Sequence, residues 1–443
     1  MSEKDSLKLG FLGMGVVGQG VWKHILRHGE ALRSRLGVGL DLHRAAVRDV
    51  SRQRLQDIPV DALTDNPVSI VNDPDIDIVC ELMGGTTEAL DLTLRAFRNG
   101  KSVVTANKAL VCEHGTELFD SAREHGVHYL FEASVAGGIP VIKALREGLV
   151  ANRFSHIFGI LNGTSNYMLT RMEREGLAYE DVLVEARNLG YVEADEALDL
   201  DGVDAAHKTA ILAYLAHGRW ISLDEMVVEG IREVTLDDIQ AARRLGCKIK
   251  LLAIISKNFQ TNRLRAGVHP MLIPVEEVVA QVDDVYNAVS ITGDVAGNTI
   301  LIGRGAGQDA TASAVISDIV DAVSAIRNGV SQKVLEQEKA FYSRISDGSF
   351  IAGLDEIEGR FYLRLSVEDK PGVLARVAEV LAASSISLST VEQSSNEGQD
   401  TASLILTTHT CTEKDMAGAV DQLQSEPSVS GRPVLLRIFD NPA

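Results

Sequence analysis

Two charged side chains four residues apart, Asp204 and Lys208, are the residues of this sequence with the clearest capacity for chemistry. They stand at the start of a run of small and apolar residues that predicts a helix, so both would lie on one helical face. A lysine ammonium can donate a proton to an oxygen that gains negative charge, and a nearby carboxylate can hold that ammonium in place. The carboxylate would also lie in the first helical turn, where the helix dipole favours it. The alternative is an ordinary ion pair on a solvated helix surface.

The segment that leads into this helix, GYVEADEALDLDGVDAAHK at residues 190–208, crowds acidic side chains together. The helix predicted at residues 179–189 ends at Gly190 and delivers the chain into this segment. A second polar stretch, LNGTSN at residues 161–166, is predicted to be a turn after a short strand, and its amides and hydroxyls could line a pocket.

A glycine motif near the N-terminus indicates a dinucleotide site. An apolar run at residues 7–12, typical of a strand, leads into Gly13-Met-Gly15-Val-Val-Gly18 and then into a helical pattern. The first glycine allows a tight turn, the second lets the backbone approach a pyrophosphate, and the third permits close helix–strand packing. The N–H groups at the start of the helix would then face the phosphates.

Arg48 and Asp49 follow the second predicted strand, at residues 42–47, and Arg52 and Arg54 come shortly after. An acidic residue at this point of a dinucleotide fold accepts hydrogen bonds from the ribose hydroxyls of NAD, whereas an arginine pairs with the 2′-phosphate of NADP. The arginines favour NADP, or the use of both cofactors. The alternative is a set of ordinary surface charges.

Further apolar strands at residues 76–82, 102–106 and 128–131 alternate with helical patterns. This alternation predicts an α/β fold with a parallel, doubly wound sheet, whose ligands bind outside the carboxyl ends of the strands. Lys108 follows one of these strands and is therefore expected on the cofactor side.

The middle of the chain changes character. Small residues dominate EASVAGGIP at residues 132–140, whose carbonyl groups could converge on a hard cation, although the spacing alone favours a plain hinge. Later apolar runs interleaved with one helix, at residues 237–245, predict a mixed sheet; the runs are residues 226–231, 249–255, 263–269 and 289–291.

Another glycine-rich segment, ILIGRGAG at residues 300–307, precedes a helix predicted at residues 312–325, which is expected to pack back on the first domain. Within it, Arg304 could contact a phosphate, and Gly305 could simply permit a close approach of two segments.

The C-terminal part forms a separate pattern after a connector at residues 331–359. Strands and helices follow in the order βαββαβ of a ferredoxin-like module; the predicted elements are residues 361–367, 372–381, 386–391, 402–407, 415–424 and 434–439. The module contains neither an evident nucleophile nor paired acids, so a binding or regulatory role is expected.

Bulk properties narrow the class of protein. The 443 residues carry a net charge of −19, which argues against nucleic acid or an anionic membrane surface as a partner. The four cysteines form no CxxC pair, which argues against a zinc site or a disulfide framework and favours a reducing, cytoplasmic compartment. No signal peptide and no apolar run of the ~20 residues that a membrane span needs is recognised.

Five motifs in this order resemble the homoserine dehydrogenase family: GFLGMGVVGQG, TANKALV, EASVAGGIP, LNGTSNYML and GYVEADEALDLDGVDAAHK. The resemblance covers residues 6–350, and DKPGVLA in the tail resembles an ACT domain, an amino-acid-sensing module. Because no aspartate kinase region precedes the motifs, the single-function bacterial type is expected. The domains implied are a Rossmann domain at 1–135 joined by 303–330, a substrate and dimerisation domain at 136–302, a connector at 331–359 and an ACT domain at 360–443.

The resemblance implies reversible reduction of L-aspartate 4-semialdehyde to L-homoserine with NADPH or NADH, on the branch that leads to threonine, methionine and isoleucine. It implies that Lys208 is the catalytic proton donor and that Lys108 lies near nicotinamide and substrate. Since a lysine must lose its proton to act as a base, homoserine oxidation is expected to rise at alkaline pH. The implied substrate-binding residues are Glu193, Asp204, Gly190, Asn162 and Thr164.

The implied cofactor-binding residues are Gly13, Gly15, Val16, Val17, Gly18, Arg48, Thr105, Lys108, Gly190 and Gly305. The family often has proline in place of Arg304, which leaves the cofactor contacts there open. A sodium site is implied at Glu132, Val135, Gly137 and Ile139, with carbonyl ligands from the last three, and here the resemblance outweighs the hinge interpretation.

Regulation by an amino acid, with threonine as the expected effector, is placed at Gly372, Val373 and Leu374 in a tail–tail interface. A homo-oligomer, dimer or tetramer, built on an isologous dimer through the middle sheet, is the family expectation. Two other hypotheses stay open: a different amino-acid-pathway dehydrogenase with an ACT tail, and a catalytically silent sensor of cofactor and amino acid.

Overall fold

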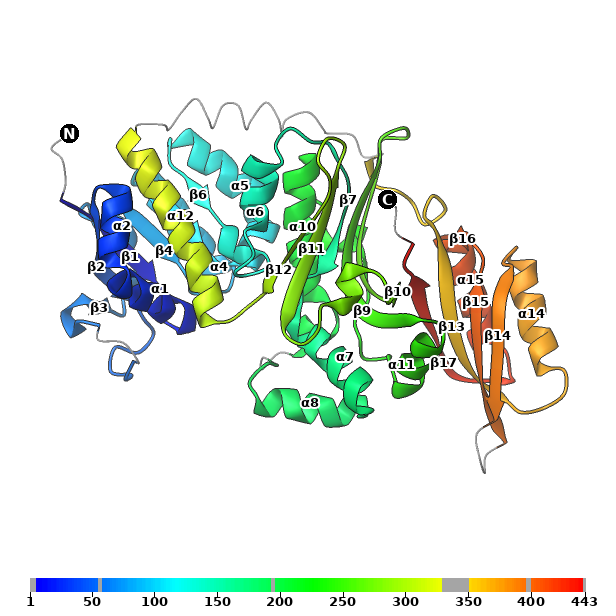
Figure 1. Cartoon of the computed structure of the whole chain (residues 1–443). Helices are drawn as coiled ribbons and strands as arrows, with labels where there is room; N and C mark the ends of the chain where they lie inside the picture. The colour runs from blue at the N-terminus through cyan, green and yellow to red at the C-terminus, as the bar shows by residue number, and fades with distance from the viewer. Residues whose placement is uncertain (1–4, 55–57, 193–195, 329–349, 396–399, 441–443) are drawn as a thin grey trace. The chain divides into compact units, whose positions relative to one another are not determined.

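The computed structural model describes residues 5–54, 58–192, 196–328, 350–395 and 400–440 (Figure 1). The described residues form two compact units. The first contains the residues up to Asn152, Ala210–Ile221 and the described residues from Leu301 to Asn328. The second contains Arg153–Thr209, Ser222–Ile300 and the residues from Phe350 onward.

The first unit contains a six-stranded sheet in the order β3-β2-β1-β4-β5-β6, and its strand pairs are parallel. This confirms the predicted doubly wound sheet. The strands β1 to β6 are Ser6–Leu12, Gly39–Ala46, Leu63–Thr64, Ile78–Glu81, Ser102–Thr105 and Tyr129–Leu130. Strand β3, only two residues long, gave no signal in the sequence.

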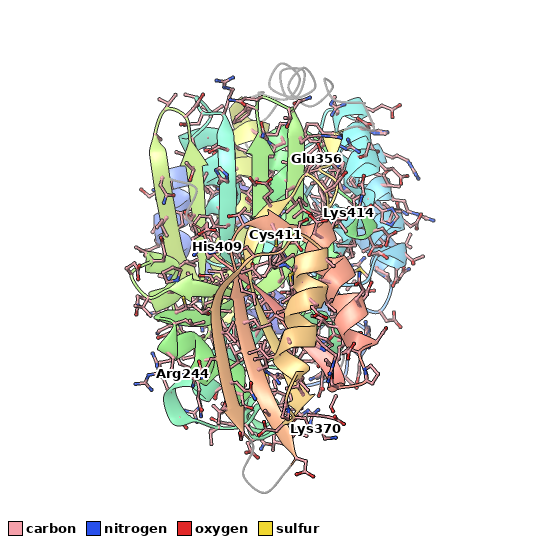
Figure 2. All side chains as sticks on the ribbon, turned by 90° about the vertical axis from the view of Figure 1, so that its right-hand side faces the viewer. Arg244, Glu356, Lys370, His409, Cys411 and Lys414 are labelled. Atoms are coloured by element: carbon pink, nitrogen blue, oxygen red, sulfur yellow. The ribbon has the colours of Figure 1, made fainter. Side chains whose placement is uncertain are left out.

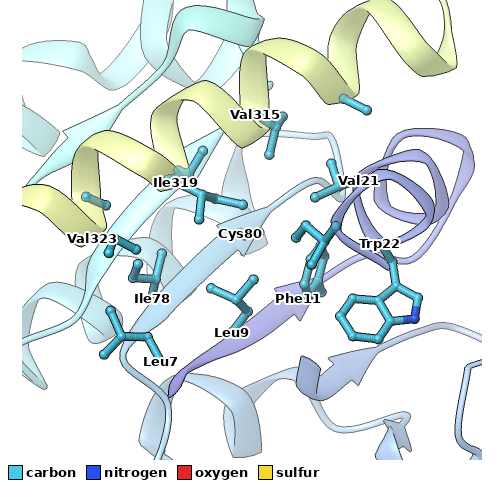
Figure 3. Packing of buried hydrophobic residues seen from close by; sticks show 14 of the residues in the cluster. Leu7, Leu9, Phe11, Val21, Trp22, Ile78, Cys80, Val315, Ile319 and Val323 are labelled. Atoms are coloured by element: carbon cyan, nitrogen blue, oxygen red, sulfur yellow. The ribbon is translucent and has the colours of Figure 1, made fainter. Parts of the chain in front are cut away.

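Helices accompany this sheet, and the last of them comes from far along the chain. They are α1 Val16–Arg27, α2 Gly29–Leu36, α3 Pro67–Asn72, α4 Thr87–Arg98, α5 Lys108–Glu124, α6 Val141–Lys143 and α12 Gln308–Asn328. Figure 3 shows Val315, Ile319 and Val323 of α12 in one buried cluster with Leu9 of β1 and Ile78 of β4. The expected return of residues 312–325 to the first domain is therefore confirmed.

The second unit is built on a long mixed sheet in the order β12-β11-β7-β9-β10-β17-β13-β15-β14. Its first strands are β7 Phe154–Ile160, β9 Cys247–Asn258, β10 Arg263–Pro274, β11 Tyr286–Gly293 and β12 Gly297–Arg304. The helices of this part are α7 Gly163–Glu175, α8 Tyr179–Asn188, α9 Glu196–Leu200 and α11 Leu236–Arg244, and α10 Val203–His217 continues into the first unit.

Two sequence interpretations of this region need correction. Residues 161–166 are not a free polar turn, because α7 begins at Gly163 and Asn162 caps it. The run at 226–231 contributes only β8 Val227–Val228, which pairs with β10. Most of the glycine-rich segment at 300–307 belongs to or adjoins β12, where pairing with β11 outweighs the weak strand propensity of glycine.

The C-terminal module has the predicted βαββαβ order. Its elements are β13 Glu358–Glu368, α14 Val373–Ala383, β14 Leu388–Ser395, β15 Thr401–Thr408, β16 Cys411–Thr412, α15 Glu413–Gln424 and β17 Val429–Ile438. Its sheet is not separate from the middle sheet, because β17 pairs with β10 in parallel at Met271 and Leu272. The amide of Phe439 extends this pairing with a bond of 2.8 Å to the Leu272 carbonyl. Among the described helices, none is long and apolar enough to cross a membrane.

Candidate functional site

The glycine turn between β1 and α1 has the geometry that a bound pyrophosphate requires. Gly13 has a φ of 100°, and a Cβ atom there would lie 2.6 Å from the carbonyl oxygen of Leu82. A Cβ on Gly18 would lie 2.7 Å from the Gly13 carbonyl oxygen, so both positions demand glycine. A Cβ on Gly15 would meet no protein atom within 4 Å, which leaves the backbone at the helix start open to a ligand. The next two residues, Val16 and Val17, begin α1 and are exposed and half-buried, respectively.

The end of β2 presents guanidinium groups. Arg48 is exposed, whereas Asp49 accepts hydrogen bonds from the backbone N–H and the hydroxyl of Ser51, at 2.8 and 2.6 Å. These bonds hold the pKa of the Asp49 carboxyl below its usual value. Arg54 donates to the carbonyl oxygen of Asp49 at 2.9 Å and so braces the loop. This arrangement leaves the Arg48 guanidinium exposed just past the end of β2.

The carboxyl ends of β4 and β5 are joined by a buried carboxylate. Glu81 accepts hydrogen bonds from the Thr105 hydroxyl at 2.7 Å and from the Met83 amide at 3.0 Å. Burial raises the pKa of Glu81, and these hydrogen bonds oppose that rise. The Thr105 hydroxyl also accepts from the Asn107 amide at 2.9 Å, so this side chain positions the loop. Asn107 caps α5, whose first residue is the half-buried Lys108.

The loop predicted to hold a cation is buried. Glu132 is 2% exposed, and its two carboxylate oxygens accept from the amides of Ile142 and Lys143 at 2.9 and 2.8 Å. Burial raises the pKa of Glu132, while the two amides lower it. Within the described part of the chain, the carbonyl groups of Val135 and Gly137 receive no hydrogen bond.

The remaining members of this loop are also constrained. The carbonyl of Ile139 accepts from the Val141 amide at 2.8 Å. Gly137 has a φ of 52°, and a Cβ there would lie 2.4 Å from the Gly305 carbonyl oxygen. Gly305 is therefore a close-approach position beside this loop, and the neighbouring Arg304 side chain is exposed.

The second unit holds the lysine and its partners. Lys208 is 9% exposed, and its ammonium donates to the carboxylate of Asp204 and to the carbonyl oxygen of Leu161, each at 2.7 Å. Asp204 is 7% exposed and accepts from the side-chain amide of Asn162 at 2.9 Å. The predicted contact between Lys208 and Asp204 is confirmed, and the alternative of a solvated surface pair is wrong.

Asn162 joins three elements at this point. Its side-chain oxygen accepts from the Ser165 amide at 2.7 Å and caps α7, while its amide nitrogen donates to Asp199 at 2.8 Å as well as to Asp204. The Ser165 hydroxyl donates to the Asp199 carbonyl oxygen at 3.0 Å. Asp199 and Ser165 were not singled out in the sequence, where nothing distinguishes them from their acidic and polar neighbours.

The other predicted substrate residues lie around the same segment. Gly190 follows α8 with a φ of 72°, and the Thr164 hydroxyl donates to the Tyr191 carbonyl oxygen at 2.8 Å. Glu193 lies outside the described residues. Glu81 is a third residue that the sequence did not reveal, because an acid inside an apolar strand carries no local signal of its partners.

The predicted regulatory residues lie at the start of α14. Gly372 has a φ of 91° and precedes the helix, Val373 is buried and Leu374 is 40% exposed. They belong to the second unit, together with Lys208, Asp204 and Asn162. The glycine turn, Lys108 and the loop of Glu132 belong to the first unit.

Taken together, the first unit offers a turn for a dinucleotide, and the second offers a fixed ammonium beside a carboxylate and an amide. This combination suits a reaction in which an oxygen atom gains charge and a proton while a cofactor changes its redox state.

Comparisons with known proteins agree with this chemistry. The sequence matches the family described as homoserine dehydrogenase, NAD binding domain, over residues 13–132, the homoserine dehydrogenase family over 140–320 and the ACT domain over 361–428. A homoserine dehydrogenase of Pseudomonas aeruginosa is 41% identical over 433 residues, 98% of each chain. The crystal structure of a homoserine dehydrogenase from Thiobacillus denitrificans is 40% identical, with a TM-score of 0.88 over 98% of each chain. A hyperthermophilic archaeal homoserine dehydrogenase, solved in complex with NADPH, is 27% identical, with a TM-score of 0.61 over 72% of this chain and 98% of that one.

Proposed function

Because this chain belongs to the homoserine dehydrogenase family of NAD(P)-dependent oxidoreductases, we propose that it catalyses the reversible reduction of L-aspartate 4-semialdehyde to L-homoserine. The observation that carries the proposal is the setting of Lys208. Two of its N–H groups bind Asp204 and Leu161, and the third has no acceptor among the described residues. A substrate oxygen can take that place.

Lys208 acts as the acid in the direction of reduction. As hydride adds to the aldehyde carbon, the carbonyl oxygen gains negative charge, and the adjacent ammonium stabilises that charge and transfers a proton to it. In the direction of oxidation, neutral Lys208 removes the hydroxyl proton. Asp204 and the Leu161 carbonyl fix the ammonium, so little reorganisation is needed when the charge develops.

Asp204, beside this lysine, would hold the amino-acid end of the substrate, and the family resemblance implies the same role for Glu193. Their carboxylates would supply negative charge for the substrate ammonium, which would be costly to bury unpaired. Asn162, Thr164 and Gly190 would complete the pocket through their amide, hydroxyl and backbone groups.

The residues of the first unit fit a nicotinamide dinucleotide, which supplies the hydride when it is bound. Gly15 leaves room for the pyrophosphate, and the amides of Val16, Val17 and Gly18 would face it. Exposed Arg48 favours NADPH, since Asp49 is already engaged by Ser51. Lys108 and Thr105 would approach the nicotinamide end, and Gly305 would add a backbone contact.

The loop from Glu132 to Ile139 would hold a sodium ion. The carbonyl groups of Val135 and Gly137 lack hydrogen-bond donors in the described residues, and the Glu132 carboxylate supplies charge. Such oxygen ligands suit a hard cation. The Ile139 carbonyl already accepts one hydrogen bond, so its second lone pair would serve the ion.

Removal of sodium tests this site without an activity assay. The melting temperature is expected to be higher in sodium chloride than in choline chloride at equal ionic strength, because an ion that binds only the folded chain stabilises it. Glu132→Gln is expected to shrink the difference, and Glu379→Gln, at an exposed position of α14, is expected to keep it. Equal melting temperatures in the two salts would argue against a sodium site.

The ACT module would bind an amino-acid effector, and L-threonine is the expected one. The loop before α14 supports this role, because Gly372 opens the helix with a left-handed conformation and leaves backbone N–H groups for a carboxylate. Backbone groups from Gly372 through Val373 to Leu374 would bind the effector at an interface between two tails in a homo-oligomer, either a dimer or a tetramer.

The test is steady-state reduction of L-aspartate 4-semialdehyde with NADPH and with NADH, each with and without L-threonine. Turnover with a preference for NADPH supports the catalytic proposal and the role of Arg48. Absence of turnover with either cofactor, in a protein that still binds NADPH, would leave a sensor as the better interpretation.

A further inference from the structure

A fully buried acid lies at the carboxyl end of β4. Glu81 is 0% exposed and follows the apolar residues Ile78, Val79 and Cys80 of the same strand. Figure 3 shows Ile78 and Cys80 in the core beside α12, and the alternation of a strand turns Glu81 to the other face. Within the described residues, no lysine or arginine forms an ion pair with Glu81. A carboxyl group is costly to bury without a cation, and an apolar residue would suit the strand, so this acid indicates a role beyond packing.

Glu81 joins two loops into a closed ring of hydrogen bonds. One carboxylate oxygen accepts from the Met83 amide, in the loop after β4, and the other accepts from the Thr105 hydroxyl at the end of β5. The same hydroxyl accepts from the Asn107 amide at 2.9 Å. The Asn107 side chain returns to the first loop, where it donates to the Gly85 carbonyl oxygen at 2.7 Å. The ring therefore fixes the two loops relative to each other.

The first of these loops has backbone that is open to a ligand. Gly84 and Gly85 are exposed, with φ values of 76° and 75°, and a Cβ on either of them would meet no atom within 4 Å. The second loop ends at Asn107, which caps α5, and Lys108 is the first residue of that helix. The ring thus holds an open glycine turn and a lysine at the same edge of the sheet.

The order of the strands indicates which half of the cofactor meets this edge. Strand β1, which leads into the glycine turn for the pyrophosphate, lies between β2 and β4. In this type of fold the end of β2 recognises the adenosine ribose, so the nicotinamide half extends over the ends of β4 and β5. The ring of Glu81 lies at the ends of these two strands.

We propose that Glu81 is a positioning residue for the nicotinamide end of the cofactor. It acts through Met83 and Thr105, since its own side chain is buried out of reach of a ligand. While the ring is closed, the turn at residues 84–85 and Lys108 are already ordered, so cofactor binding does not have to order them. The proposal rests on the cofactor part of the proposed function and not on the identity of the substrate.

Binding of two ligands to the full chain tests this role. They are NADPH and 2′-phospho-ADP-ribose, a fragment of NADPH that lacks the nicotinamide. Glu81→Leu removes both acceptors of the ring, and Thr105→Val removes the hydroxyl that links the two loops. Each variant is expected to bind NADPH at least about fivefold more weakly and the fragment within about twofold of the wild type, because only the nicotinamide end loses its ordered loops. Glu81→Gln keeps one acceptor oxygen and is expected to lose less affinity for NADPH.

Two controls match the chemistry of these changes. Ser102→Ala removes a buried hydroxyl at the amino end of β5, where it accepts from the His128 amide at 3.2 Å. Glu356→Gln changes a carboxylate that also accepts from a backbone amide, that of Gly353 at 2.9 Å, but Glu356 is an exposed residue of the second unit (Figure 2). Both controls are expected to bind the two ligands as the wild type does.

Wild-type affinity for NADPH in either Glu81→Leu or Thr105→Val, measured on folded protein, would overturn the proposal. An equal loss of affinity for both ligands would also overturn it, because a purely structural defect does not distinguish the nicotinamide from the rest of the cofactor. Urea unfolding curves show whether each variant is folded. A loss confined to NADPH in a protein that does not reduce L-aspartate 4-semialdehyde would support the role of Glu81 and refute the proposed reaction, so the two proposals can fail separately.

Discussion

Lys208 and Asp204 are ionisable side chains buried next to each other, and both have fixed hydrogen-bond partners. The ammonium has the Leu161 carbonyl and the Asp204 carboxylate, and the carboxylate also has the Asn162 amide. Removing one member of a buried pair leaves the other without compensation, which is the main energetic risk at such a site. At the scale of the residue, function and stability are therefore linked.

Replacement of Lys208 by methionine is expected to lower kcat about 10²- to 10⁴-fold, since the proton donor is lost. Binding of NADPH, followed by fluorescence titration, is expected to be unchanged, because the glycine turn belongs to the other unit. Lys208→Arg keeps a positive charge next to the buried Asp204 carboxylate. It therefore controls for the effect of leaving that carboxylate unpaired in the methionine variant. A methionine variant with activity within threefold of the wild type would contradict the role of Lys208.

The buried carboxyl of Glu81 allows a prediction about the direction in which the free energy of unfolding changes with pH. Burial raises the pKa of this carboxyl in the folded chain, so the folded state holds the proton more tightly than the unfolded state, where the pKa is ~4.3. The contribution of Glu81 to the free energy of unfolding is therefore full below the unfolded pKa and is lost as the pH rises through the folded pKa. A glutamine at position 81 is neutral at every pH, so a variant that contains it does not lose this contribution to the free energy of unfolding as the pH rises.

Glu81→Gln is accordingly expected to gain stability relative to the wild type between pH 5 and pH 8. Urea unfolding at both pH values measures the difference, and Glu379→Gln, which removes an exposed carboxylate, serves as the control. A difference between Glu81→Gln and wild type that stays constant or decreases with pH would refute the argument.

At the scale of the element, the helices α5 and α7 each follow a strand, and both begin with an asparagine cap. Asn107 caps α5 and reaches the Gly85 carbonyl at 2.7 Å, and Asn162 caps α7 and reaches Asp199 and Asp204. In each case one amide side chain ends the preceding loop, satisfies an unpaired helix N–H and fixes a neighbouring segment. The position of the cap therefore decides the position of functional groups.

Asn162→Ala is expected to cost about 1 kcal/mol of unfolding free energy through the lost cap. It is also expected to lower kcat, because Asp204 loses a hydrogen-bond donor. Thr412→Ala removes the cap of α15, where the hydroxyl accepts from the Asp415 amide at 3.0 Å, and is expected to lower stability alone. Urea unfolding and initial rates on both variants measure this, and equal rates in the two variants would contradict the positioning role of Asn162.

At the scale of the molecule, the C-terminal module shares a β-sheet with the rest of the second unit. Strand β17 pairs with β10, and buried charges cross the junction. Arg364 binds the fully buried Asp238 of α11 at 2.7 and 3.0 Å, and Arg437 binds Glu229. Regulation by this module would therefore act through a continuous sheet and not through a flexible tether.

Truncation after residue 354 is expected to destabilise the remaining chain by at least about 3–5 kcal/mol. It would leave the buried Asp238 without its arginine and would open the edge of β10. Urea unfolding and light scattering compare the truncated and full chains. An unchanged unfolding midpoint would show that the module is independent, and deletion would then be a clean test of threonine sensitivity.

Local patterns in the sequence determined much of the fold. The glycine motif, the alternation of apolar strands and helices, and the βαββαβ order all depend on residues close in the chain, and the structure has them. The helix with Asp204 and Lys208 was equally predictable, because four-residue spacing on a helix fixes a shared face.

Only the tertiary structure decided the contacts between distant segments. Leu161 and Lys208 are 47 residues apart, and Arg437 and its partner Glu229 are 208 residues apart. The helix start at Gly163 was hidden because glycine, threonine and serine are weak helix formers, and the long-range contacts of Asn162 help to fix it. Sequence periodicity records which face of an element is apolar, but not which distant backbone or buried charge it will meet.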